Sequence, residues 1–246
     1  MKGIFHVHTK EFSYDSKVSF EEIKEFCRKK GFSFVALAEH SGSMNKKKMK
    51  KLVKKCKEMS KEGLIFIPGL EILTKEGYEV IGIGIKKFIH KKPLEETVNF
   101  IHKNKGIAIL AHPCKYKNLP KNLSVDGIEV LNFEYDGFFP CPKALQLLEK
   151  NMKIFGIFGL DVHRKIHLRN IFAEVKCKLK EKEIINTLLL RKFMNKNSFL
   201  ILKPIDKVNS FYHRLYLFFH VCFSLFKFLG RGIFKIIRKL KINKNG

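Results

Sequence analysis

The segment IFHVHT, residues 4–9, begins with apolar residues and carries two histidines two positions apart. Its apolar character predicts a β-strand over 3–8. Side chains alternate between the faces of a strand, so we expect His6 and His8 to project from one face and their apolar neighbours from the other. Two imidazoles on one face can grip one ion, although a single histidine after a strand is more often a hydrogen-bonded loop residue. The rest of the sequence must decide between these interpretations.

Short β-rich apolar runs alternate with segments of helical period along the first 205 or so residues. This alternation is typical of βα units around a parallel sheet. After the first strand, further strands are predicted at 32–38, 64–67, 79–85, 107–111, 127–131, 154–160, 171–175 and 199–202. The last two are expected to pair at an edge of the sheet. Between the strands, Ser19 and Glu22 predict a capping box at the start of the first helix.

Acids and histidines recur at the ends of the predicted strands. They are His6 and His8, Glu39 and His40, Glu71, His112, Glu129, and Asp161 with His163. In closed βα barrels the carboxyl ends of the strands converge on one face, where the active site is assembled. Imidazole and carboxylate together suit zinc, manganese or iron, and there are more candidates here than one ion needs. We therefore expect a cluster of two or three divalent ions, with Glu71 as a candidate bridge.

Seven short motifs, taken in order, resemble the PHP (polymerase and histidinol phosphatase) family of metal-dependent phosphoesterases. They are HVHT (6–9), YDS (14–16), AEHSG (38–42), PGLE (68–71), LAHP (110–113), GIEVLN (127–132) and GLDVH (159–163). The resemblance covers about residues 3–193. It implies an α/β fold, a distorted (β/α)7 TIM-like barrel over 1–205. It also implies hydrolysis of a phosphomonoester, a nucleotide-like diester or an oligonucleotide end by a metal-bound hydroxide.

The resemblance further implies which residues hold the ions. Carried over by position, His6, His8, Glu71 and Asp161 would surround one ion, Asp15, His40 and His163 a second, and His112 with Glu71 the remaining one. Among these, Glu71, Asp161 and His163 are predicted to be catalytic. Glu129, with Asn132, is a candidate for orienting a histidine ligand, since a ligating imidazole usually needs an acceptor for its other ring proton. Arg164 is a candidate phosphate contact, although a surface arginine is the commoner case.

The chain departs from the family pattern at three positions. Many relatives carry an acid where this chain has Ile4, and an aspartate where it has Glu39. After the third predicted strand, relatives often place a ligand histidine where this chain offers Glu79. Either Glu79 ligates in its place, or the third ion is weakly held.

Lysine and arginine number 49 against 23 acids, so the 246 residues carry a formal net charge of +26. Such a charge favours anionic partners, which include nucleic acid, phosphorylated metabolites and anionic lipid. The nine lysines between 46 and 61 favour a solvated helix face over a nucleic-acid surface. The six cysteines are scattered without a CxxC pair, and no signal-peptide pattern opens the chain, so we expect reduced thiols in a cytoplasmic protein.

A different composition begins near the end, over 206–246. From residue 207 this segment is basic, aromatic and free of acids, and its longest uncharged stretch, 215–226, is shorter than the ~20 residues that span a bilayer. A cationic, hydrophobic helical tail lying on an anionic membrane surface is the prediction, which would make the protein peripheral on the membrane. Packing of this tail against the barrel or an oligomeric partner is the alternative, and the oligomeric state is left open.

Two other functions remain open. The His-x-His after the first strand also resembles amidohydrolases, although no clear lysine-bridge context follows the middle strands and GLDVH fits the PHP family better. The second is a weakly active barrel that serves as a binding module for membranes or nucleic acid. The nearly complete set of ligand-type residues argues against it.

Overall fold

The computed structural model describes residues 1–204 except 121, 122 and 152, together with Phe218 and Cys222. Twelve strands in these residues form two six-stranded sheets. The first has the order β12 (Ile201–Leu202), β11 (Phe193–Lys196), β10 (Phe172–Val175), β1 (Lys2–Val7), β2 (Phe34–Leu37) and β4 (Ile65–Ile67). The second has the order β3 (Glu39–His40), β5 (Gly69–Leu73), β6 (Glu79–Ile83), β7 (Ile107–Leu110), β8 (Gly127–Asn132) and β9 (Phe155–Gly159).

Backbone hydrogen bonds join the two sheets where β1 ends. Val162, which follows β9, donates its N–H to the His6 carbonyl over 3.1 Å, and its own carbonyl accepts from the His8 N–H over 3.2 Å. The C-terminal end of β1 is therefore held directly beside the segment after β9. Residues about 155 positions apart in the chain become neighbours at this junction.

A closed (β/α)7 barrel is not found among the described residues, so that part of the expected fold is corrected to a mixed α/β fold with two sheets. The regular parallel pattern is broken because β6 pairs antiparallel with both β5 and β7, and β10 pairs antiparallel with β1. Residues 74–78 between β5 and β6 form a tight turn with Gly77 at a φ of 85°. A tight turn can join only antiparallel neighbours, whereas a parallel pair needs a crossover.

All nine predicted strands are present, with small shifts of their ends. Three strands were not predicted, namely β3, β5 and β11. The expected pairing of 171–175 with 199–202 is wrong, because β11 lies between β10 and β12 and pairs with both. The sequence FMNK of β11 is not an apolar run, since it carries the buried polar residue Asn195.

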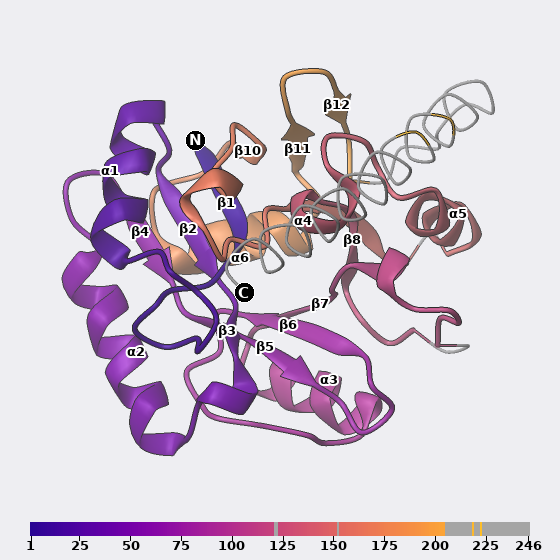
Figure 1. The fold of residues 1–246 in the computed structure, drawn as a ribbon, viewed down its shortest axis with the longest axis horizontal. Coiled ribbons are helices and arrows are strands. Elements are labelled where there is room, and N and C mark those ends of the chain that lie inside the picture. The colour runs from indigo at the N-terminus through magenta and orange to yellow at the C-terminus, as the bar shows by residue number, and fades with distance from the viewer. Residues whose placement is uncertain (121–122, 152, 205–217, 219–221, 223–246) are drawn as a thin grey trace, which may run out of the picture.

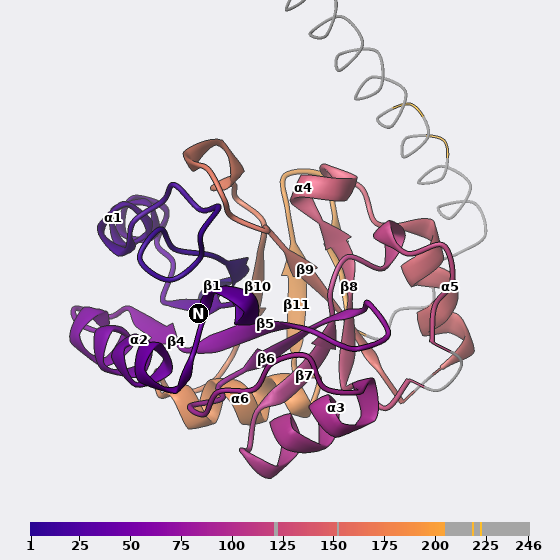
Figure 2. The same cartoon turned by 60° about the horizontal axis from the view of Figure 1, so that its bottom comes forward.

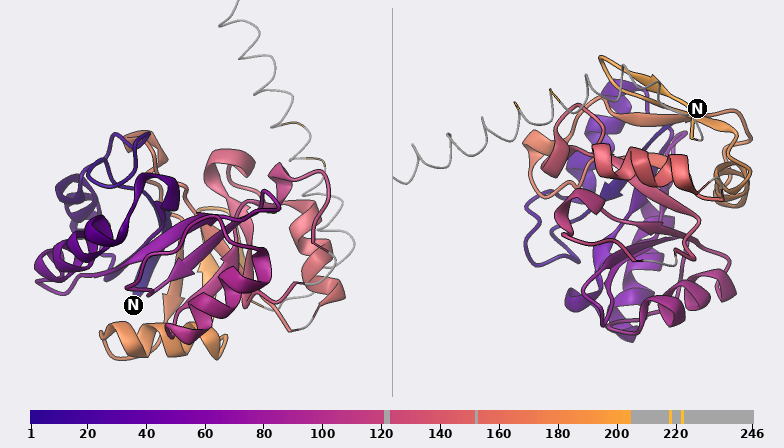
Figure 3. Two further views of the ribbon diagram at one scale, coloured as in Figure 1. Left: turned by 90° about the horizontal axis from the view of Figure 1, so that it is seen from below. Right: turned by 90° about the vertical axis from the view of Figure 1, so that its right-hand side faces the viewer.

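Within residues 1–204, six α-helices surround the sheets: α1 (Phe20–Lys30), α2 (Lys46–Met59), α3 (Leu94–Lys103), α4 (Phe133–Asp136), α5 (Pro142–Lys150) and α6 (Glu181–Leu189), leaving out the undescribed positions 121, 122 and 152. The capping box at the start of α1 is confirmed, and Gly31 ends that helix with a left-handed φ of 69°. In α2 one face buries Met49, Leu52 and Cys56, while most of its lysines are exposed. Helices α1 and α2 lie on one side of the molecule and α5 on the opposite side (Figures 1, 2 and 3).

The expectation of six reduced cysteines is wrong for two of them. Cys114 and Cys141 form a disulfide with their Cα atoms 6.1 Å apart, and 27 positions separate them in sequence. The fold brings them together because Cys114 lies just after β7 in a short 3-10 helix, Pro113–Lys115, and Cys141 directly precedes α5. The spacing in the sequence carries no CxxC signal for such a pair. Cys27 and Cys56 are buried thiols, and Cys177 is a half-buried one.

The predicted tail, 206–246, lies outside the described residues apart from Phe218 and Cys222. Within the described part of the chain, no helix has both the length and the apolar character that crossing a bilayer requires.

Candidate metal centre

His6 and His8 converge through a bulge at the end of β1. His6 has a φ of 58°, and the register between β1 and β2 shifts between Phe5 and Val7. Because of this bulge, simple alternation fails, and Phe5 and Val7 pack into two different core clusters. The two imidazole rings nevertheless come within 5.0 Å between their centroids. The predicted convergence of the histidines is confirmed, but its cause is the bulge and not a regular strand.

Glu71 lies at the centre of the cluster and is 3% exposed. Its Oε1 atom is 2.9 Å from His112 Nε2 and 3.3 Å from His6 Nε2. Its Oε2 atom is 2.9 Å from His40 Nδ1 and 3.8 Å from His8 Nε2. The two carboxylate oxygens therefore face two different groups of imidazoles, which is the arrangement that a bridging ligand needs.

Asp161 closes the cluster from the segment after β9. Its Oδ1 atom lies 3.5 Å from His6 Nε2, 3.3 Å from His8 Nε2 and 3.2 Å from His163 Nδ1. Asp161 and His112 have positive φ values of 54° and 29°, as His6 does. Such a backbone conformation costs a non-glycine residue about 1–3 kcal/mol. The fold sustains it at three of the residues that face one another here.

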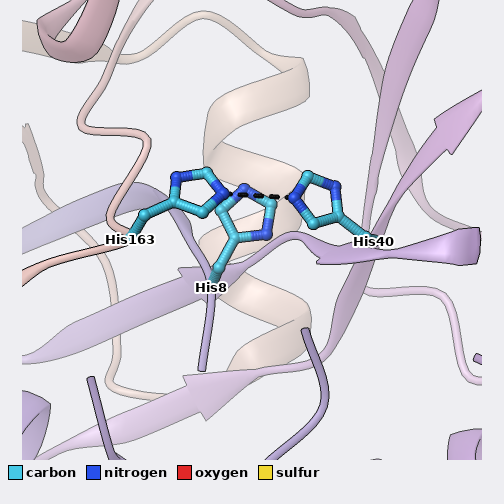
Figure 4. A group of neighbouring side chains, drawn as sticks. All are labelled: His8, His40 and His163. Carbon is cyan, nitrogen blue, oxygen red and sulfur yellow. Dashed lines mark hydrogen bonds between the residues drawn. The ribbon is translucent and has the colours of Figure 1, made fainter. Parts of the chain in front are cut away.

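A second group is formed by His40, His163 and Asp15. His40 Nε2 and His163 Nε2 are 3.1 Å apart, and Asp15 Oδ2 lies 3.2 Å and 3.4 Å from them. Figure 4 shows the rings of His40 and His163 facing each other next to His8. Bonds of 2.0–2.1 Å to a tetrahedral ion separate its ligand atoms by about 3.3 Å. The three atoms thus have the spacing of ligands on one ion.

The chemistry of the donor atoms fits divalent ions. His6 Nε2, His8 Nε2 and Asp161 Oδ1 are buried and have no hydrogen-bond partner within the described residues. Buried polar atoms without partners are costly, so these atoms call for a cation that they face together. His8, His40 and His163 form one such group of neighbouring ligand atoms, His6, His8 and Asp161 another, and His6, Glu71 and His112 a third.

Around this cluster a set of polar residues fixes the ligand-type side chains. Glu129 Oε1 is 2.7 Å from His6 Nδ1, and Glu129 Oε2 accepts from the His112 N–H over 2.8 Å and from Asn132 Nδ2 over 2.8 Å. Asn132 Nδ2 also lies 3.3 Å from Asp161 Oδ2. Gly159 makes room for this arrangement, because a Cβ atom there would come 1.8 Å from Glu129 Oε1.

Glu39 is buried and supports the loop after β1. Its carboxylate accepts from the Thr9 N–H over 3.1 Å, from Thr9 Oγ1 over 2.6 Å and from Ser13 Oγ over 2.5 Å. Ser13 Oγ in turn accepts from the His40 N–H and lies 3.4 Å from His8 Nδ1. Burial raises the pKa of Glu39 to about 7, although hydrogen bonds from Ser13 and Thr9 oppose this shift.

Burial and neighbouring charges set the protonation of the cluster. Burial lowers the pKa of His6, but the carboxylates of Asp161, Glu129 and Glu71 outweigh burial and raise it well above its ordinary value. In the same way, burial lowers the pKa of His40, His112 and His163, and nearby acids raise it further than burial lowers it. For His8 burial prevails and lowers the pKa to about 3. When no cation compensates the acids, these shifts favour the protonated form of His6, His40, His112 and His163 and the neutral form of His8.

Three positions that the sequence analysis singled out either lie outside the cluster or form contacts that were not expected. Ile4 is fully buried among the apolar side chains of the core. Arg164 is exposed and forms no ion pair among the described residues. Glu79 Oε2 lies 3.5 Å from His112 Nε2, but it also pairs with the Lys115 ammonium.

Four residues contact the site although the sequence analysis did not identify them: Lys115, Tyr135, Gly159 and His167. His167 Nδ1 lies 3.0 Å from the Asp161 carbonyl and its Nε2 lies 2.8 Å from Glu134, so it supports the segment that carries Asp161 and His163. The ring of Tyr135 is 4.8 Å from that of His112. Only the position of Gly159 and His167 inside or just after the GLDVH motif gave a signal for them.

Residues 5–198 match the family described as the PHP domain. The chain belongs to this family. A comparison of the sequence with curated proteins gives no significant match. The ligand-type residues that surround Glu71 in space all lie within this matched part of the chain.

Several solved structures resemble this PHP domain in fold, although their sequence identity to it is low. A two-domain protein from Bacteroides vulgatus containing a predicted PHP-like metal-dependent phosphoesterase is 17% identical, with a TM-score of 0.63 over 82% of this chain and 66% of that one. An amidohydrolase from Chromobacterium violaceum is 15% identical, with a TM-score of 0.52 over 84% and 99%. The lesion-specific endonuclease PfuEndoQ from Pyrococcus furiosus is 16% identical, with a TM-score of 0.53 over 77% and 56%.

These likenesses concern the fold. The chain spans just under two thirds of the Bacteroides protein and about half of the endonuclease. Membership of the PHP domain family and the clusters of ligand-type side chains support a metal-dependent hydrolase.

Proposed function

We propose that this PHP domain hydrolyses phosphoester bonds with two or three divalent ions, Zn, Mn or Fe. The observation that carries the proposal is the position of Glu71, whose two carboxylate oxygens face separate groups of imidazoles. In this proposal Glu71, with His6, His8 and Asp161, would hold one ion, and Asp15, with Nε2 of His40 and Nε2 of His163, would hold another. Glu71 would be shared with His112 if a third ion binds. Divalent ions bound there would activate water and neutralise charge on the phosphoryl oxygens.

Neighbouring residues of the protein orient the side chains that would hold the ions. Glu129 accepts the Nδ1 proton of His6, so that Nε2 of the same ring is free to ligate. The carboxylate of Glu39 holds Thr9 and Ser13, and through them the loop between His8 and Asp15. The left-handed backbone at His6, His112 and Asp161 stores strain that favours one arrangement of the ligands. The catalytic residues in this proposal are Glu71, Asp161 and His163.

The substrate that we propose is a phosphomonoester or a nucleotide-like phosphodiester. The formal net charge of +26 favours anionic substrates, and an oligonucleotide is one of them. One structural neighbour is a lesion-specific endonuclease, and another contains a predicted PHP-like metal-dependent phosphoesterase, which supports a phosphorylated substrate class.

Activity of site variants tests this proposal. His8→Ala and Asp161→Ala each remove an atom that faces the centre of the cluster. We expect either change to lower kcat/KM for an aryl phosphodiester roughly 100-fold or more, since loss of outer-shell partners alone costs about 10–100-fold. His102→Ala is the control, because His102 lies on α3 and pairs with Asp126. Activity equal to wild type in the first two variants would contradict the proposal.

Hydrolysis of amides is the second candidate, favoured by the shared fold of the amidohydrolase from Chromobacterium violaceum. A parallel screen of phosphoester and cyclic-amide substrates with the metal-loaded protein separates the two. A weakly active binding module is the third, and it predicts fewer than one bound ion per chain together with salt-sensitive binding of polyanions.

The segment 207–246 is proposed to attach the protein to an anionic membrane surface. Its charge and aromatic residues support this, and its positive charge would attract acidic headgroups. Flotation with vesicles of phosphatidylserine and phosphatidylcholine tests it. We expect the full chain to float and a variant lacking 207–246 to stay at the bottom, whereas a full chain that does not float would contradict it.

A further inference from the structure

The ammonium group of Lys115 lies at the His112 end of the cluster. Lys115 Nζ is paired with Glu79 Oε2, and this same oxygen is 3.5 Å from His112 Nε2. Lys115 thus engages the carboxylate oxygen that faces the site. A carboxylate oxygen that already accepts a charge-assisted hydrogen bond from an ammonium group is a poor ligand for a second cation.

The surrounding residues hold this ammonium group in position. Lys115 ends the short 3-10 helix that follows His112, and the disulfide of the neighbouring Cys114 ties that helix to the start of α5. Lys115 Nζ lies 5.9 Å from the centroid of the Tyr135 ring, within the range of a cation–π contact. The side chain of Lys115 is 40% exposed, so the ammonium group is also open to a ligand from solvent.

With Glu79 engaged, this end of the cluster offers a third ion too few ligands. Of the group that His6 forms with Glu71 and His112, His6 is assigned to the ion of His8 and Asp161, so Glu71 and His112 remain. His112 Nε2 lies at hydrogen-bond distance, 2.9 Å, from Glu71 Oε1. Glu71 is already shared with the imidazoles of His6 and His40. Bound zinc usually has three or four protein ligands, and two do not suffice for tight binding.

We propose that the Lys115 ammonium replaces one divalent ion, so that the chain binds two ions and Lys115 supplies the third positive charge to a phosphate group. This inference rests on the proposed metal centre. One ion would be held by His6, His8 and Asp161. The other would be held by Asp15, His40 and His163. His112 then donates a hydrogen bond to Glu71.

The number of Mn²⁺ ions per chain tests the proposal without any measurement of activity. The full chain is stripped of metal, titrated with Mn²⁺ by calorimetry and analysed for bound metal after gel filtration. We expect two ions in the wild type and a third, weaker one in Lys115→Met, whose Glu79 is released. Lys115→Met/Glu79→Gln should return to two ions. The control is Lys117→Met, an exposed lysine two positions along, which should bind two.

Three ions in the wild type, or two in a folded Lys115→Met with an unchanged melting temperature, would overturn the replacement. A wild type that binds no ion would instead overturn the metal centre itself. The binding of inorganic phosphate tests the second part with Glu79→Gln as the reference, because Lys115→Met/Glu79→Gln differs from it only in the ammonium group and both should bind two ions. We expect about ten-fold weaker binding of phosphate by the double variant than by Glu79→Gln at saturating Mn²⁺. Equal binding would overturn the role of Lys115 at phosphate.

Discussion

Glu129 Oε1 lies 2.7 Å from His6 Nδ1, and this contact turns the opposite nitrogen of the imidazole, Nε2, toward Glu71 and Asp161. The same carboxylate accepts from the backbone N–H of His112. One buried side chain thus orients residues that come from β1 and from the end of β7. A carboxylate beyond the ligands that fixes the ring of a histidine is a recurring feature of metal sites.

Replacement of Glu129 should weaken metal binding without removing a ligand. In Glu129→Gln the acceptor for the His6 Nδ1 proton loses its charge, so we expect an affinity for Mn²⁺ that is lower by about 10–100-fold in calorimetry, as is typical of such partners. Glu58→Gln, an exposed carboxylate on α2, is the matched control. An affinity in Glu129→Gln equal to that of the control would argue that Glu129 does not position His6.

Gly159 should be intolerant of a side chain for the same reason. A Cβ atom at this position would come 1.8 Å from Glu129 Oε1, so Gly159→Ala must displace the carboxylate from His6. We expect a loss of Mn²⁺ affinity comparable to that of Glu129→Gln. Gly42→Ala serves as the control, because a Cβ atom there meets only His90, at 3.8 Å. Wild-type affinity in Gly159→Ala would contradict the close packing of Gly159 against Glu129.

The stability of the metal-free protein should fall as the pH rises above about 6.5. Neighbouring acids overcome burial and raise the pKa of His6, His40, His112 and His163, so their protonation stabilises the fold fully below the unfolded pKa of about 6.5. This contribution is lost as the pH rises through the raised values. His8, whose pKa burial lowers to about 3, is neutral in the folded state throughout this window, so it does not add to this loss.

Divalent ions should reverse this loss, because they bind deprotonated imidazoles and compete with protons. We therefore expect Mn²⁺ to raise the melting temperature more at pH 8 than at pH 6. Thermal unfolding with and without Mn²⁺ at both values checks it. A shift that is larger at pH 6 would contradict the raised pKa of these histidines in the metal-free protein.

Loss of the disulfide should destabilise the protein measurably. The bond closes a loop across 27 positions, so Cys114→Ser/Cys141→Ser should lower the free energy of unfolding by about 2–4 kcal/mol in urea titrations. Cys177→Ser changes a half-buried free thiol and is the control. If the free energy of unfolding of the double variant lies within ~0.5 kcal/mol of that of the control, the disulfide contributes little to stability.

The residues of the cluster were predictable because each ends a strand or sits in a motif of fixed order. The geometry of these residues was less predictable. Glu71 was expected after a strand at 64–67, yet it lies inside the unpredicted strand β5, since Pro68 divides one apolar run into two short strands. The antiparallel strands around β6 depend on a tight turn, and this is why the regular barrel expected from alternating elements is not found among the described residues.

Contacts between distant positions escaped the sequence for a physical reason. The bulge at His6 depends on how β1 pairs with β2, and the disulfide depends on how the segment after His112 packs against α5. The pairing of Glu79 with Lys115 joins residues that lie 36 positions apart. No local pattern of charge or hydrophobicity encodes such neighbours, so Glu79 could be proposed as a ligand from sequence although an ammonium group already engages it.

Metal-dependent cleavage of phosphoesters is the central claim. The most direct measurement compares metal-stripped protein with protein reloaded with Mn²⁺ or Zn²⁺ on an aryl phosphomonoester, an aryl phosphodiester and a cyclic amide. We predict that the stripped protein is inactive and that reloading restores cleavage of a phosphoester and not of the amide. Phosphoester cleavage that is unchanged by removal of the metal, or amide cleavage alone after reloading, would contradict it.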